Sequence, residues 1–380
     1  MKIGIFGGSF DPVHIEHIHL AQSAIDGLGL DKLLVMPAFA PPHKPYKTLA
    51  PDEHRLEMCR LAFANMPKVE VCNYEIARGG TSYTYLTCQH FRELYPTAQL
   101  FWLVGTDMLR DFPTWKNPEN ILQNATLAVC ARNEKGDWLE EEQKQFFERF
   151  HTRFAVIPYH GADVSSTKIR VYAGSGESVE CWVGGRVAEY IRAWRLYEIP
   201  NAREALAGEK PTRKAHSLRV AEVAAKRAVQ LRMSERKAIA AALFHDCAKN
   251  IAPSDERLAG FCVPSEWGEV PESVWHQFAG AYLAERVFGV DDCDILNAVR
   301  YHTSGRENMS DLEKLIFLSD MVEEERSYDV VDKIRESFWN DGLDKCLLLA
   351  LSETVAYLKR KNAYVYPLTE KALNYYKNGK

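Results

Sequence analysis

The sequence predicts an α/β domain with a parallel sheet, followed by an all-α domain. Its first half alternates short apolar runs with helical patterns, which is typical of βαβ units in a doubly wound sheet. Its second half has long segments of helical period and no convincing strand. A chain of 380 residues is also too long for one typical core. We therefore expect two domains, over residues 1–197 and 198–380.

Six strands are expected in the first domain, separated by amphipathic segments such as Pro51–Asn65 and Tyr83–Tyr95. The candidate strands are Lys2–Phe6, Leu33–Met36, Val69–Cys72, Leu100–Val104, Leu127–Cys130 and Phe154–Pro158. Ligands of such sheets bind beyond the carboxyl ends of the strands, so a site is expected at that edge.

Helices alone are expected in the second domain. A polar segment with proline and glycine, residues 198–214, is interpreted as a linker that leads into it. The candidate helices are Ala215–Arg232, Ser234–Phe244, Gln277–Phe288, Ile295–Tyr301, Asp311–Glu323 and Leu343–Lys359.

Composition limits the classes of partner. The net charge of −5 and the pI near 6.2 argue against a general nucleic-acid binder. Nine scattered cysteines without a CxxC pattern indicate reduced thiols rather than a disulfide framework. No signal-peptide core is present, and no apolar run approaches the ~20 residues that cross a bilayer. We expect a cytoplasmic protein with no nucleic-acid or membrane partner. A homo-oligomer is compatible with these observations.

The run "KIGIFGGSFDP" predicts a strand followed by a loop that can approach a phosphate closely. Gly7 and Gly8 permit backbone conformations that are barred to other residues. Pro12 precedes a helix predicted from about Val13, whose free N–H groups and dipole favour an anion. A tight turn without a ligand is the alternative interpretation.

Three histidines follow in "HIEHIH". His14 and His17 share one helix face and can point back at an anion. A metal site that includes His19 is the weaker interpretation, because His19 faces elsewhere and no cysteine or acidic pair completes a zinc shell. Phosphate binding by His14 and His17 is therefore the preferred hypothesis, with His19 on the helix surface.

The stretch "GIFGGSFDPVHIEH" resembles the N-terminal signature of the nucleotidylyltransferase superfamily, whose hallmark is (H/T)xGH. Far along the chain, "VSSTKIR" resembles the second signature, ISSTxIR. Between them, "PPHK", "TSYTYLT" and "LVGTDMLRDFPTWKNPENIL" are similar to segments of bacterial nicotinate-nucleotide adenylyltransferases. The resemblance covers about residues 1–197 and implies a Rossmann-like fold.

This resemblance implies transfer of the adenylyl group of ATP to nicotinate mononucleotide, which gives nicotinate adenine dinucleotide and pyrophosphate. Mg²⁺ would enter with ATP. The implied catalytic residues are His14, His17 and Lys44. The implied ATP-binding residues are Gly7, Gly8, Ser9, Phe10, His14, His17, Ser166, Thr167 and Arg170. The implied residues for nicotinate mononucleotide are Lys44, Thr81, Tyr83, Thr84, Asp107 and Trp115, although core packing is the simpler role for Trp115.

One residue departs from the first signature, since Glu16 stands where the family has glycine. If its carboxylate faced the triphosphate it would repel it, whereas an outward carboxylate would be harmless and favourable to the helix dipole.

Another acceptor, such as phosphopantetheine, is the alternative substrate. The segment from Gly105 to Trp115 and the added length of the chain argue against it.

The second half holds only four histidines, each in or beside a helical segment, together with the adjacent pair His245–Asp246 and, further on, Asp320. Four imidazoles and two carboxylates on helices suit one or two divalent transition metals. Surface or capping histidines are the alternative. The metal ligands predicted from this set are His216, His245, Asp246, His276, His302 and Asp320.

From "HSLRV" through "LFHDCAK" to "IFLSDMVEEER", the chain resembles the HD-domain phosphohydrolases of the YqeK type. That resemblance implies an HD-fold, a di-iron centre in which Asp246 is also catalytic, and symmetrical cleavage of diadenosine tetraphosphate to two ADP. Two details depart from the family: Gln277 follows His276 in place of glycine, and Val322–Arg326 replaces Ile-Glu-Pro-x-Arg.

The polyphosphate contacts predicted in this half are Lys249, Thr303 and Arg306, with a salt bridge as an equal alternative for Arg306. Histidine and carboxylate ligands suit iron, manganese, cobalt or zinc, and only the resemblance selects iron. A different nucleotide substrate and a non-catalytic nucleotide-sensing module are the remaining alternatives.

Overall fold

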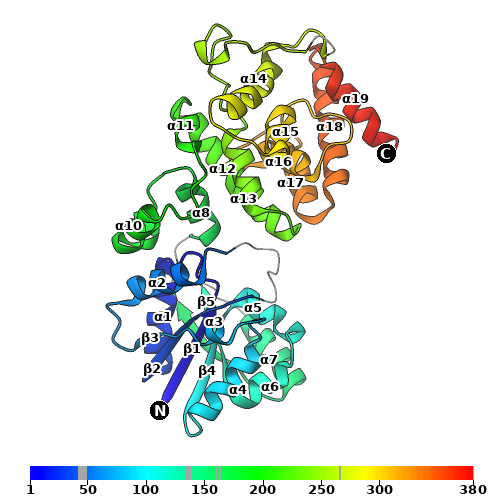
Figure 1. Ribbon diagram of the computed structural model, residues 1–380. Helices are drawn as coiled ribbons and strands as arrows, with labels where there is room; N and C mark the ends of the chain where they lie inside the picture. Colours follow the sequence, from blue (N-terminus) through cyan, green and yellow to red (C-terminus); the bar gives the residue numbers. More distant parts are fainter. Residues whose placement is uncertain (42–48, 133–137, 160, 162–163, 265–266, 380) are drawn as a thin grey trace. The chain divides into compact units, whose positions relative to one another are not determined.

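The computed structural model describes residues 1–41, 49–132, 138–159, 161, 164–264 and 267–379. The described residues form two compact units. The first contains those of 1–41, 49–169 and 178–196, and the second those of 170–177 and 197–379. The two units are described separately below (Figure 1).

A six-stranded parallel sheet forms the centre of the first unit, in the order β3-β2-β1-β4-β5-β6. The strands are β1 (Lys2–Gly8), β2 (Lys32–Pro37), β3 (Val69–Val71), β4 (Gln99–Gly105), β5 (Thr126–Arg132) and β6 (Ala155–Tyr159). All six predicted strands are confirmed, with small shifts at their ends. The strand order reverses between β1 and β4, and the carboxyl ends flanking this switch point are where such sheets bind ligands.

Helices cover the sheet on both faces, and Figure 1 shows α1 and α2 on one side with α4 and α6 on the other. The central strands are therefore buried on both faces, which explains their continuous apolar runs; Ile3, Ile5 and Leu127 are fully buried. The helices are α1 (Ile15–Leu28), α2 (Asp52–Phe63), α3 (Tyr74–Arg78), α4 (Thr84–Leu94), α5 (Thr106–Asp111), η1 (Phe112–Thr114), α6 (Pro118–Asn124), α7 (Trp138–Phe150), α8 (Ser166–Gly174), α9 (Glu180–Val183) and α10 (Gly185–Ala193).

The second unit is helical, as predicted. Its elements are α11 (Ala202–Ala207), α12 (Pro211–Gln230), α13 (Glu235–Phe244), η2 (Glu256–Leu258), α14 (Glu272–Arg286), α15 (Cys293–Tyr301), α16 (Asp311–Val322), α17 (Val331–Asn340), α18 (Leu343–Arg360) and α19 (Pro367–Lys377). All six predicted helices are confirmed. Small residues such as Ala221, Ala225 and Ala241 are fully buried, so α12 and α13 can pack closely.

The segment predicted as a linker is part of this core, so that prediction was wrong. Ile199, Ala202, Ala205 and Leu206 are buried within the hydrophobic cluster of the second unit. The polar residues between them misled the sequence interpretation, because α11 is short and buries only one narrow face.

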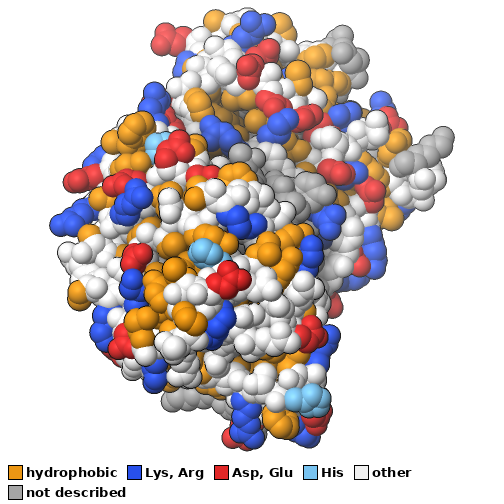
Figure 2. All heavy atoms as spheres, turned by 60° about the horizontal axis from the view of Figure 1, so that its bottom comes forward, with side chains coloured by type: hydrophobic (Ala, Val, Ile, Leu, Met, Phe, Trp, Pro, Cys, Tyr) orange, Lys and Arg blue, Asp and Glu red, His pale blue; other side chains and the backbone are white. Residues whose placement is uncertain are grey.

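On the molecular face shown in Figure 2, basic and acidic side chains are interspersed with apolar ones. Within the described ranges, no helix combines the length and hydropathy needed to cross a membrane.

Candidate active sites

The loop after β1 is shaped by close contacts between side chains. Neither Gly7 nor Gly8 has a positive φ, so the expectation of a special backbone conformation there was wrong. Space is the reason for glycine at position 7, because an added Cβ would lie 2.9 Å from the ring of Trp102. Phe10 takes the left-handed conformation instead, with φ of 47°, and its buried ring lies 5.0 Å from that of His17.

His14 and His17 come together where α1 begins. The backbone N–H of His14 donates to Nδ1 of His17 over 3.1 Å, and the two ring centroids are 3.8 Å apart. Burial, and then the neighbouring His14, lower the pKa of His17 well below its ordinary value. Next to the free N–H groups of a helix N-terminus, the two imidazoles form a compact donor site that suits an anion.

Glu16 lies on the first turn of α1 and is buried. Its Oε1 lies 3.1 Å from Nδ1 of His19, whose side chain is 53% exposed. Its Oε2 is buried and has no hydrogen-bond partner in the part of the chain that the structure describes. The carboxylate that replaces the family glycine is thus engaged by the helix-surface histidine.

The two signature segments meet in space. The Oγ of Ser166, at the first position of α8, donates to the backbone oxygen of Pro12 over 3.0 Å, across 154 residues of sequence. The N-terminal turn of α8, which includes Thr167, is therefore joined to the loop that precedes His14. Two helix N-termini at one place provide N–H donors for a polyphosphate.

The two other predicted phosphate contacts are Arg170 and Lys44. Arg170 is buried and forms an ion pair with Glu235, and both residues belong to the second unit. Lys44 lies outside the described residues. Arg55 is fully buried and donates a hydrogen bond to the backbone oxygen of Ser9 over 2.9 Å. The sequence interpretation did not select this arginine.

The residues predicted for the nicotinate side lie on neighbouring segments. Thr81 pairs with Ala40 in an isolated bridge, and Tyr83 and Thr84 begin α4. The Nζ of Lys116 stands 4.3 Å from the ring centroid of Tyr83. Asp107, in the first turn of α5, is exposed. Trp115 is buried in the core of the first unit, 5.4 Å from the ring of Phe112.

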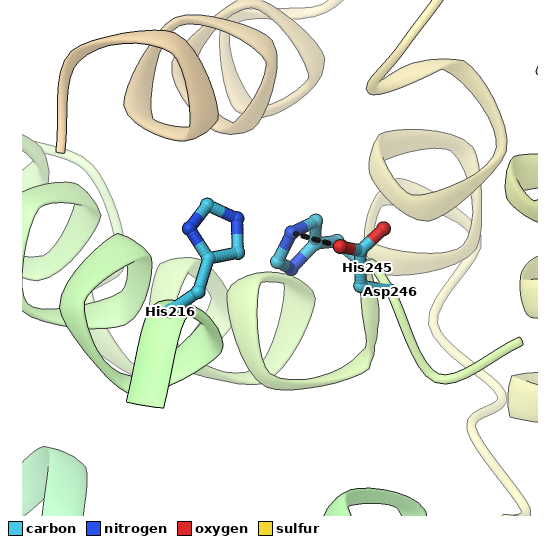
Figure 3. Close-up of side chains that lie close together, drawn as sticks. All are labelled: His216, His245 and Asp246. Atoms are coloured by element: carbon cyan, nitrogen blue, oxygen red, sulfur yellow. Dashed lines mark ion pairs between the residues drawn. The ribbon is translucent and has the colours of Figure 1, made fainter. Parts of the chain in front are cut away.

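All six predicted metal ligands converge in the second unit. Three overlapping groups have their ligand atoms within 4.8 Å of one another: His216–His245–Asp246, His245–His302–Asp320 and Asp246–His276–His302. They come from α12, α14, α16 and the residues just after α13 and α15. Figure 3 shows the rings of His216 and His245 on neighbouring segments, with the Asp246 carboxylate beside His245. His245, Asp246 and His302 each belong to two of these groups, so the six side chains form one continuous cluster.

The hydrogen bonds of the histidines identify which ring nitrogens are available. Nδ1 of His245 lies 2.6 Å from the carbonyl oxygen of Ala242, and Nδ1 of His302 lies 2.8 Å from that of Val299. A carbonyl can only accept, so Nδ1 carries the proton and Nε2 keeps its lone pair. The buried Nε2 of His245 has no hydrogen-bond partner among the described residues. The chemistry of these residues therefore fits a divalent metal.

Electrostatics keep the cluster in its ligating form. Burial lowers the pKa of His245 and of His276 to about 4, which leaves both imidazoles neutral at pH 7. Burial alone would raise the pKa of Asp246, but His245, His276 and His302 hold it well below its ordinary value. Neutral imidazoles and ionised carboxylates are the forms that bind metal.

Three cations adjoin the cluster, and only Lys249 was predicted. Its Nζ lies 3.0 Å from Nε2 of His276. Arg213 donates to Oδ2 of Asp246 over 2.8 Å, and Arg326 forms an ion pair with Asp320. Arg213 stands one helical turn before His216 on α12, and this spacing was the sequence signal that could have identified it.

The other two predicted polyphosphate contacts differ in their surroundings. The Oγ1 of Thr303 lies 3.2 Å from Nε2 of His276, at the edge of the cluster. Arg306 donates to Oε1 of the buried Glu313 over 2.7 Å and lies over the ring of Tyr301.

Two family models match different parts of the chain. Residues 5–171 match the family described as cytidylyltransferase-like, and residues 213–325 match the HD domain. A "Probable nicotinate-nucleotide adenylyltransferase" of Clostridium tetani is 34% identical over 197 residues, covering 52% of this chain and 98% of the relative. The chain belongs to the nicotinate-nucleotide adenylyltransferase family. Its second half adds an HD domain.

A relative from Mycoplasma genitalium matches both halves at once. It is called "Probable nicotinate-nucleotide adenylyltransferase/Ap4A hydrolase" and is 28% identical over 375 residues, covering 97% of each chain. A crystal structure from Clostridium acetobutylicum, described as a predicted HD superfamily hydrolase involved in NAD metabolism, is 34% identical. It covers 47% of this chain and 96% of that one, with a TM-score of 0.42.

Proposed function

We propose that this chain is a bifunctional enzyme with one active site in each half. The first half transfers the adenylyl group of ATP to nicotinate mononucleotide. The second half hydrolyses diadenosine tetraphosphate symmetrically to two ADP. The observation that carries the hydrolase is the convergence of all six predicted ligands on one buried cluster. The match of the Mycoplasma genitalium relative over both halves supports the pairing of the two activities.

The transferase needs no protein nucleophile, because the phosphate of the mononucleotide attacks the α-phosphorus of ATP directly. The chain's own residues then position the reactants and stabilise negative charge. His14, His17 and the first turn of α8, with Ser166 and Thr167, are the proposed contacts of the triphosphate. Lys44 and Arg170 remain proposed contacts of the leaving phosphates, and Mg²⁺ is the metal proposed to enter with ATP.

The acceptor side is assigned to the segments around Tyr83 and Trp115. The Nζ of Lys116 beside the ring of Tyr83 places a positive charge there. The first turn of α4 carries no acidic residue, so its N–H groups also favour an anion. Both features suit the carboxylate of nicotinate, and the proposal also keeps Thr81, Thr84 and Asp107 on this side.

In the hydrolase, the proposed metal is iron. When bound, divalent metals supply Lewis acidity and an activated water at neutral pH. The four histidines, Asp246 and Asp320 would hold them. Lys249, Arg213 and Arg326 lie against the ligands and are proposed to hold the oxygens of the polyphosphate. Thr303 and Arg306 complete the proposed set.

A paired assay on the purified full-length chain tests both activities. The first arm supplies ATP, nicotinate mononucleotide and Mg²⁺; the second supplies diadenosine tetraphosphate with Fe²⁺ or Mn²⁺. We expect His245→Ala to lose the hydrolase activity and keep the transferase activity. We expect His17→Ala to lose most of the transferase activity and keep the hydrolase activity. A transferase that prefers phosphopantetheine would overturn the first assignment. Metal-loaded protein that binds diadenosine tetraphosphate without cleaving it would overturn the second.

A further inference from the structure

The ligand histidines are anchored in different ways. His245 and His302 are held by backbone carbonyls of their own helices, at 2.6 and 2.8 Å from Nδ1. His216 is held by a side chain from a different part of the chain, since its Nδ1 lies 3.2 Å from Oε1 of Glu323, the residue directly after α16. A substitution can therefore remove the anchor of His216 without changing the main chain.

Glu323 is itself held firmly. It is 2% exposed, and its Oε2 accepts from Nε of Arg219 over 2.7 Å and from the backbone N–H of Glu325 over 3.0 Å. Arg219 lies one turn after His216 on α12. The same helix thus supplies both the ligand and the cation that orients the ligand's acceptor.

The geometry of His216 follows from this contact. The ring of His216 lies between two carboxylates, since its Nε2 lies 2.8 Å from Oδ1 of Asp320. If Nε2 bound a metal, the single ring proton would be on Nδ1, where Oε1 of Glu323 can accept it. Histidines that bind metals commonly donate their other N–H to a carboxylate, which fixes the tautomer and makes the ligand more basic.

We propose that Glu323 is a positioning residue of the metal centre, which holds His216 in the tautomer that presents Nε2 to the metal, with Arg219 keeping Glu323 in place. The inference rests on the metal-binding role proposed above. Neither Glu323 nor Arg219 was selected from the sequence, where Glu323 was noted only as part of the segment that departs from the family pattern.

The experiment measures Co²⁺ affinity of the metal-stripped full-length protein by competition with a chelator. Loss of such an outer partner typically costs about 10–100-fold in metal affinity, and we expect this loss for Glu323→Ala. Glu323→Gln should lose less, because its amide oxygen can still accept from Nδ1. Glu325→Gln is the matched control: Glu325 pairs with Nη2 of Arg219 over 2.8 Å and is 69% exposed. It should bind Co²⁺ as the unmodified chain does.

His216→Ala supplies the benchmark. The double variant His216→Ala/Glu323→Ala should bind Co²⁺ as weakly as His216→Ala alone. A general effect of Glu323→Ala on folding would instead lower the Co²⁺ affinity of the double variant further. Thermal unfolding of each metal-free variant checks the fold. Full Co²⁺ affinity in Glu323→Ala, or an equal loss in Glu325→Gln, would overturn the positioning role. Full affinity in His216→Ala would instead show that the proposed metal site is wrong.

Discussion

Glu209 is a carboxyl group whose charged form the folded protein disfavours. Burial, and then the negative charge of Asp246, raise the pKa of Glu209 to about 8 from its ordinary value of 4.5. The hydroxyl of Ser217 donates to both carboxylate oxygens, at 3.3 and 3.1 Å, and offsets part of this effect. The folded protein therefore binds this proton more tightly than the unfolded chain does.

We expect Glu209→Gln to stabilise the protein at pH 8 and to change little at pH 4.5. Between these pH values the unmodified protein should lose free energy of unfolding as the pH rises, by at most about 1.4 kcal/mol per pH unit from this group. Denaturant unfolding in the presence of a chelator at several pH values measures the difference. A stability difference that does not vary with pH would contradict the assigned pKa.

At the proposed transferase site, His17→Ala should lower kcat by about 10²–10³-fold, equivalent to about 2.7–4 kcal/mol of transition-state stabilisation.

Glu16→Gly should leave the kcat/KM of the transferase nearly unchanged, because the Glu16 carboxylate is engaged by the exposed His19. It should lower stability by about 1 kcal/mol, since glycine is a poor helix former and a favourable charge at the helix N-terminus is lost. Steady-state kinetics and thermal unfolding check both variants. A large gain in kcat for Glu16→Gly would show that the Glu16 carboxylate repels ATP.

Among the elements, α16 carries Asp320 and begins with a capping box. The hydroxyl of Ser310 accepts from the N–H of Glu313 over 3.3 Å, and Oε2 of Glu313 accepts from the N–H of Ser310 over 3.1 Å. Arg306 donates to the other oxygen of Glu313. The capping box thus stabilises the helix that carries the proposed metal ligand Asp320. Arg306 has a structural partner in Glu313 in addition to its proposed contact with the substrate.

Ser310→Ala should lower the free energy of unfolding by about 1 kcal/mol through loss of the cap, with no change in the KM of the hydrolase. Arg306→Ala is the informative partner. A drop in stability with unchanged KM would assign Arg306 to the support of α16, whereas a raised KM would assign it to the polyphosphate. Thermal unfolding and hydrolysis kinetics on both variants separate the two roles.

At the scale of the whole molecule, the hydrophobic cluster around the sheet and the one around the long helices are made of different residues. One contains strand residues such as Ile5 and Leu127, and the other contains helix residues such as Ala225 and Leu318. All six proposed metal ligands belong to the second unit. Metal binding should therefore stabilise the second core directly.

Calorimetric unfolding should show two transitions, of which Co²⁺ or Mn²⁺ raises only one. At a free metal concentration of about 100 times Kd, the expected stabilisation is about 2.7 kcal/mol. In the His245→Ala variant the shift should shrink, while the other transition stays in place. A shift of both transitions by metal would show that the two units unfold together.

Local patterns explain which features could be predicted. The strands and long helices follow from apolar periodicity, which depends only on neighbouring residues, and all of those predicted are confirmed. The linker prediction was wrong because α11 buries Ala202, Ala205 and Leu206 behind a polar exposed face. At the loop after β1, the sequence indicated glycines but not their reason, which is the ring of Trp102 from a neighbouring strand.

The sequence by itself determined the two-part architecture, the family and the candidate ligands, because these depend on periodicity and short motifs. Only the tertiary structure decided which groups surround those ligands. Glu323 meets His216 across 107 residues, Arg213 meets Asp246 across 33, and Ser166 meets Pro12 across 154. Such contacts depend on how separate helices and strands pack, and a side chain's protonation and orientation are set by these neighbours rather than by its position in the chain.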